Sequence, residues 1–184
     1  MIIYNELMVT RFNTKTFTEL QEYKQKHSIT IPIYGAPWGI KELVPLKKYI
    51  IVFEMNNDTN KIMGISIIKN YIYMDKYYNI YEDRNYNRFV YKGKYRIDRS
   101  DLSKFEEIIL KIFDLILFYG YSSPPEDSKK RRGSHMKRGQ GISLIPKKKY
   151  TTYKINNKKL LTLLVEMFKR RFYTTEFISD RLNF

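Results

Sequence analysis

Three stretches of the chain place apolar residues at helical spacing, and each predicts an amphipathic helix. The first covers residues 16–27, where Thr16 is positioned to cap the helix and Glu19 to complete a capping box. The second covers residues 101–119, and the third runs from an Asn157 cap to about residue 172. We therefore expect three helices, the middle one being the longest.

The middle helix is apolar over a wide arc, so we expect it to be deeply buried. Gly120 is placed to end it, and the two prolines that follow cannot continue it. The predicted core-facing stripe consists of Phe105, Ile109, Ile112 and Ile116.

Short runs of β-branched and aromatic residues predict strands between the first two helices. Residues 49–55 and 61–69 flank an Asn-rich turn and predict a hairpin. Residues 88–91 and 95–98 flank Gly93 and predict a second hairpin, with the glycine supplying a positive φ. A further strand is expected near residue 31. The pattern thus predicts an α+β fold in which three helices pack on a small, curved or barrel-like, mostly antiparallel sheet.

Length and composition favour one domain spanning residues 1–184, with a basic loop at about 120–149. The chain has enough apolar residues, 43%, to form a core. No apolar run is long enough for a spanning helix, and the first ten residues lack the layout of a signal peptide. We therefore expect an intracellular protein, in a host cytoplasm or nucleus or in a virion, that is neither secreted nor associated with a membrane.

Positive charge dominates the chain, with 34 Lys and Arg against 19 Asp and Glu and a formal net charge of +15. A field of this sign attracts polyanions, of which nucleic acid is the commonest in cells. Nine of the cations, and no acid, lie between residues 129 and 149. They are Lys129, Lys130, Arg131, Arg132, Lys137, Arg138, Lys147, Lys148 and Lys149.

The basic block also contains three glycines, so flexible backbone and cationic side chains occur together, as in segments that follow phosphates. We predict that these cations, with Ser134 and His135, bind nucleic acid. For the first half of the block, a solvated loop or a localisation signal is the alternative. The second half alternates into apolar residues and is expected to be ordered.

Two aromatic residues near the first predicted strand are candidates for base contacts. Tyr34 and the single Trp38 lie in a segment rich in Pro and Gly, from which a ring can be presented to a base. The alternative is that both rings pack in the core or over the end of the sheet.

Catalytic motifs are not found. There is no phosphate-binding loop and no nucleophile elbow, and a lone Gly139-Gln140-Gly141 is a weak signal. The absence of Cys excludes disulfides and thiolate zinc sites, and only His27 and His135 could supply imidazole. We predict no cofactor, no metal and no catalytic residue. A metal-dependent nuclease using Glu54, Asp58, His135 and Lys137 is a weaker alternative.

A resemblance to known proteins rests on the segments Ile33-Tyr34-Gly35-Ala36-Pro37 and Ile51–Ile65. Together they resemble the PUA-like barrel group that includes EVE, ASCH and YTH modules. The Asn-rich turn before Ile-Met-Gly-Ile, with a later Lys-Arg-Gly-Gln-Gly, also resembles uncharacterised proteins of large DNA viruses. The similarity covers roughly residues 29–146. It implies a PUA-like fold and the binding of RNA or of a modified base, with Tyr34 and Trp38 as the cage candidates.

The sequence as a whole thus predicts a non-catalytic protein that binds RNA or DNA mainly through phosphates, and that comes from a large DNA virus. A virion structural or genome-packaging protein is the main alternative, because the same charge would condense a genome without a defined site.

Overall fold

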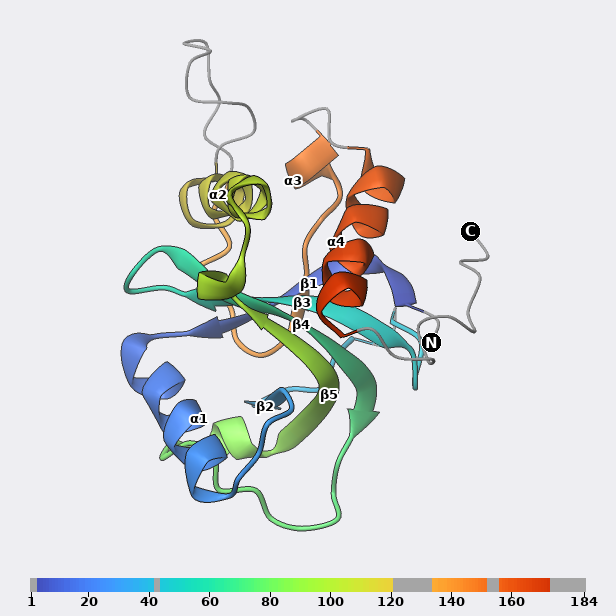
Figure 1. The fold of residues 1–184 in the computed structure, drawn as a ribbon. Coiled ribbons are helices and arrows are strands. Elements are labelled where there is room, and N and C mark those ends of the chain that lie inside the picture. The colour runs from blue at the N-terminus through green and yellow to red at the C-terminus, as the bar shows by residue number, and fades with distance from the viewer. Residues whose placement is uncertain (1–2, 42–43, 121–133, 152–155, 173–184) are drawn as a thin grey trace.

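The structure is a computed structural model that describes residues 3–41, 44–120, 134–151 and 156–172. A curled sheet of six strands lies at the centre, with α2 and α4 above it and α1 below it in Figure 1. The strand order is β2-β5-β4-β3-β1-β6. The elements in chain order are β1 (Ile3–Phe12), α1 (Thr14–Lys26), β2 (Ile33–Ala36), β3 (Tyr49–Asn56), β4 (Lys61–Ile72), the 3-10 helix η1 (Arg84–Asn87), β5 (Phe89–Asp98), the 3-10 helix η2 (Arg99–Asp101), α2 (Lys104–Tyr119), β6 (Ser143–Leu144), α3 (Lys148–Thr151) and α4 (Asn157–Arg171).

The sheet is mixed, so the α+β prediction is confirmed but a mostly antiparallel sheet is too simple a description. β1 runs parallel to β3, with Val9 opposite Phe53, while the other pairings are antiparallel. The sequence pattern did not predict β1 as a strand. Four consecutive buried residues, Leu7 to Thr10, explain why: the strand is packed on both faces and does not alternate between apolar and polar positions.

The hairpin of β3 and β4 is confirmed, since Ile51 pairs with Ile67 and Val52 with Ser66. The second predicted hairpin is wrong, because residues 89–98 form the single strand β5. Gly93 has a different use there. A Cβ at this position would lie 2.2 Å from the carbonyl oxygen of Ile67 and 2.6 Å from Cγ of Pro32, so only glycine permits the close approach of β5 to its neighbours.

The three long helices are where the pattern placed them, with corrected ends. α1 begins three residues nearer the N-terminus than a Thr16 cap requires: Asn13 is the N-cap, and Thr16 completes the capping box in place of Glu19. α2 is capped by Ser103 and ends at Gly120 with a φ of 68°, as predicted. α4 is capped by Asn156, one residue before the predicted cap. Within the described part of the chain, no helix combines the length and the apolar content that a membrane span needs.

Two apolar clusters lie on opposite faces of the sheet. One packs α2 and α4 against alternate residues of β3 and β4, such as Phe53, whose ring stacks on that of Phe113 at 4.7 Å. The other packs α1 and β2 against the remaining residues of the same strands. Of the predicted stripe on α2, Ile109 and Ile116 are buried and Ile112 is half-buried, but Phe105 is 63% exposed and its assignment to the core is wrong.

Candidate functional site

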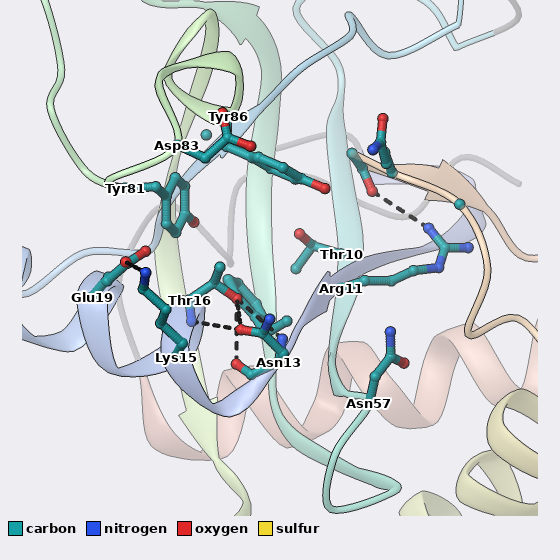
Figure 2. A pocket seen from close by; sticks show the side chains of 15 residues that line it. Thr10, Arg11, Asn13, Lys15, Thr16, Glu19, Asn57, Tyr81, Asp83 and Tyr86 are labelled. Carbon is teal, nitrogen blue, oxygen red and sulfur yellow. Dashed lines mark hydrogen bonds and ion pairs between the residues drawn. The ribbon is translucent and has the colours of Figure 1, made fainter.

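A cavity of about 340 Å³ opens on the α1 side of the sheet, where the end of β1 leads into α1. Segments from five parts of the chain surround it, so it exists only in the folded protein. In Figure 2, Tyr81 and Tyr86 lie on one side, Arg11 on the other, and Thr10 and Asn13 between them. The lining residues are Thr10, Arg11, Phe12, Asn13, Lys15, Thr16, Glu19, Gly35, Asn57, Tyr81, Asp83, Tyr86, Gly139, Gln140 and Gly141.

The floor of the cavity is built by the turn from β1 into α1. The Asn13 side chain accepts a hydrogen bond from the Thr16 amide at 2.7 Å, and Asp58 accepts one from the Thr14 amide at 2.8 Å. These two bonds satisfy donors in the first turn of the helix and hold α1 against the β3–β4 turn. The pKa of Asp58 is lowered by its bond from Thr14, so this turn carboxylate is engaged in structure.

The tyrosine wall comes from the segment between β4 and β5. Asn87 fixes this segment, since its side chain accepts from the amides of Ile80 and Tyr81 at 3.0 Å and donates to the Tyr81 carbonyl at 2.7 Å. The rings of Tyr81 and Tyr86 meet edge to face at 6.1 Å. Gly35 allows this packing, because a Cβ there would lie 2.1 Å from the Tyr86 carbonyl oxygen.

The opposite wall includes Gly139, Gln140 and Gly141, which lie in the second half of the basic block. Arg11 donates from Nε to the Met136 carbonyl and from Nη1 to the Gly141 carbonyl, and Asn57 donates to the Lys137 carbonyl at 3.1 Å. Met136 is buried and its amide donates to the Leu117 carbonyl. Residues 136–141 are thereby held against the end of the sheet at the mouth of the cavity.

Arg11 differs from Lys15, the other cation that lines the cavity, in its partners. Arg11 is half-buried, its hydrogen bonds go to backbone carbonyls, and among the described residues no carboxylate forms an ion pair with it. Burial lowers the pKa of Arg11 to about 10. Lys15, by contrast, pairs with Glu82 and lies 3.9 Å from Glu19. A guanidinium without an acidic partner makes this end of the cavity favourable for an anionic or carbonyl group.

The residues of the basic block that were predicted to bind nucleic acid fall into three groups. Lys129, Lys130, Arg131 and Arg132 lie outside the described residues. Ser134, His135, Arg138 and Lys148 are exposed and Lys137 is half-buried. Lys147 forms an ion pair with Glu6 at 2.6 Å, and the ammonium of Lys149 donates to the carbonyl of Ser134. The charges most available on this surface are therefore Lys137, Arg138 and Lys148.

The side chain of Tyr34 is buried inside the fold. It is 1% exposed, and its hydroxyl donates to the Glu54 carboxylate and accepts from the Ser66 hydroxyl at 2.8 Å. Glu54 is also 1% exposed and accepts three hydrogen bonds from Arg96 at 2.7–3.1 Å. Burial beside the Glu54 carboxylate raises the pKa of Tyr34. The ring is thus committed to a buried polar network and is not available to a base.

Trp38 lies just after β2 and is 59% exposed. It is therefore not a core residue. It does not line the cavity, although its backbone carbonyl is near Gly141, which does.

The four residues of the nuclease alternative do not assemble a metal centre in the described part of the chain. Glu54 is buried and bonded to Arg96 and Tyr34, whereas Asp58 and His135 are exposed. No group of three or more His, Asp or Glu residues able to hold a metal ion is found among the described residues.

The sequence did not single out Arg11 or Tyr86 as site residues. The signal that pointed nearest to them was Gly139-Gln140-Gly141, which lines the cavity with φ values of +119° and +68° at its two glycines. Compared with family models, with curated proteins and with solved structures, the chain gives no match.

Proposed function

We propose that this chain is a non-catalytic nucleic-acid-binding protein in which the cavity receives an unpaired base and the adjoining basic segment contacts phosphates. One observation carries the proposal: Gly139, Gln140 and Gly141, which directly follow Lys137 and Arg138 in the chain, line a cavity that Tyr81 and Tyr86 line on the other side. Phosphate-binding charge and a stacking surface therefore lie side by side, as they do in sites for single-stranded nucleic acid.

The cavity suits a base in size and chemistry. Its volume of about 340 Å³ falls in the range of small-molecule sites. Tyr86 offers an aromatic surface, and Thr10 and Gln140 bring hydrogen-bonding groups to the edge of a ring. Arg11 can donate to a base carbonyl or to a phosphate oxygen. Lys137 and Arg138 follow directly on the loop that Arg11 holds.

We also propose that the fold belongs to the PUA-like barrel group. The support is the resemblance over residues 29–146 together with a curled, mixed sheet in which β1 is parallel to β3. The cavity residues are not the cage expected from the resemblance, since Tyr34 is buried and Trp38 lies outside. Base recognition would fall instead to Tyr86, which is half-buried, with Tyr81 packed edge to face against its ring.

The phosphate part of the proposal is tested by salt dependence. Replacing Lys137, Arg138 and Lys148 by Gln should weaken binding of a single-stranded oligonucleotide and flatten the slope of log K against log salt by about two units. Lys104→Gln with Lys111→Gln is the matched control, because both lysines are exposed on α2, across the sheet from the cavity.

An equal slope for wild type and the triple variant would contradict the phosphate role.

The size of the binding site distinguishes the proposal from genome packaging. A defined site saturates at a fixed short length of oligonucleotide, whereas a packaging protein would coat single or double strands of any length.

A further inference from the structure

The outward side of α2 carries a second apolar stripe that the core covers only in part. Its members alternate at spacings of three and four residues, which is the seam spacing of helices that pack along one another. Phe105 is 63%, Ile108 54% and Tyr119 49% exposed, and the two residues between them in the stripe are half-buried. The stripe consists of Phe105, Ile108, Ile112, Leu115 and Tyr119.

The stripe borders a groove of about 260 Å³ between α2 and α4. The groove is almost entirely apolar and is lined by Ile109, Ile112, Asn156, Lys159, Leu160 and Leu163. Figure 1 shows α2 and α4 together above the sheet. Large exposed apolar side chains beside an apolar groove are the usual mark of an interaction surface.

Lysines flank this surface on both sides. Lys104 and Lys111 are exposed on α2, seven residues apart along one edge of the stripe, and Lys159 is exposed on the α4 side of the groove. None of the three forms an ion pair among the described residues, while Glu166 on α4 is bonded to Lys169 at 2.8 Å. The surface is therefore apolar along its length and positive along its edges.

We propose that the stripe and groove of α2 and α4 dock an acidic amphipathic helix of a partner protein. The stripe spans the 15 residues from Phe105 to Tyr119, or about 21 Å between the first and last, which matches a partner helix of about four turns. The apolar face of that helix would fill the groove, and acidic residues beside it would meet the three lysines.

Two other occupants fit less well. A second copy of the chain that docked through the same surface would bring the edge that carries Lys104 and Lys111 against the same positive edge of its partner across a two-fold axis. Like charges brought together in this way repel. A bilayer surface would be attracted to the lysines, but a flat surface cannot fill a concave groove. An acidic helix satisfies charge and shape together, and its docking does not depend on nucleic-acid binding on the opposite face.

The test uses two designed three-heptad peptides with Leu at the a and d positions, one with Glu and one with Lys at the e and g positions. Fluorescence anisotropy with the full chain should show binding of the acidic peptide and at least about tenfold weaker binding of the basic one. Ile108→Gln should reduce binding of the acidic peptide at least about fivefold. Lys104→Glu with Lys111→Glu should reverse the preference.

Lys137→Glu with Arg138→Glu is the matched control and should leave peptide binding unchanged, so loss of nucleic-acid binding and loss of peptide binding are separable. Absence of acidic-peptide binding, or a charge reversal without effect, would overturn the proposal. So would a chain dimer that Ile108→Gln dissociates, or phosphatidylserine vesicles that compete with the acidic peptide.

Discussion

The two faces of the sheet are packed in different ways. Against α2 and α4 the strands present apolar side chains, such as Phe53 and Ile67, that join one large hydrophobic cluster. Against α1 the same strands present Thr10, Glu54 and Ser66, and the cavity lies at their end. The comparison shows that the apolar face supplies stability, while the α1 face accepts buried polar groups and an unfilled space. Such departures from close apolar packing are where function is expected.

The largest effect on stability is expected from a substitution that breaks the polar network of the α1 face. Arg96→Met would leave the Glu54 carboxylate, 1% exposed, without its cation, and should lower the free energy of unfolding by about 3–5 kcal/mol. Adding Glu54→Leu should recover much of the loss, because no buried charge then remains. Urea unfolding measures both. A loss below about 1 kcal/mol for the single variant would show that the network is solvated.

The apolar face should respond to volume alone. Ile116→Ala, at 1% exposure, should cost about 2–4 kcal/mol, whereas half-buried Ile112→Ala should cost about 1–2 kcal/mol. Phe105→Ala is the matched exposed control and should cost less than about 0.5 kcal/mol. Urea midpoints of the three variants give the order. A Phe105 effect as large as that of Ile116 would mean that the outer stripe is packed.

An ion pair on the α2 and α4 side should make stability depend on acid. The hydrogen bonds from Arg171 lower the pKa of Glu106 to about 2, below its usual value of 4.5. Because the folded-state pKa is the lower one, the stabilisation is present above about pH 4.5 and is lost as the pH falls towards 2. Glu106→Gln should cost about 1–3 kcal/mol at pH 7 and remove this part of the acid dependence. Thermal melts from pH 7 to pH 2 test it, and parallel curves for both proteins would contradict it.

The smallest effect is expected at Trp38, which is 59% exposed beside the α1 face. Trp38→Ala should change the free energy of unfolding by less than about 0.5 kcal/mol. A substantially lower Tm for Trp38→Ala would show that the Trp38 ring packs against the fold.

Much of the fold follows from local patterns. The hairpin of β3 and β4 and the helices α2 and α4 have apolar spacing and end signals that tertiary contacts did not override. β1 does not follow from a local pattern, because a strand buried on both faces does not alternate between apolar and polar residues. Gly93 was ambiguous, since a glycine between lysines suits a turn as well as a close approach of two strands, and only the neighbouring backbone decides.

The candidate site was predictable only in part. The charge of residues 137–149 is visible in the sequence, and so is the order implied by their alternating apolar residues. The cavity is not visible, because Arg11, Gly35 and Tyr86 come from separate segments that meet only after the sheet curls. The sequence also favoured Tyr34 over Tyr86, whereas in the structure Tyr34 is 1% exposed and Tyr86 lines the cavity.

The central claim, that the cavity receives a base, is tested most directly by the affinity of Tyr86→Leu for a single-stranded dodecamer. Leucine keeps the apolar volume but removes the aromatic face. The account predicts a loss of about 1–3 kcal/mol in binding, measured by anisotropy at one fixed salt concentration, with a Tm near that of wild type. A folded variant that binds the dodecamer with wild-type affinity would contradict the claim.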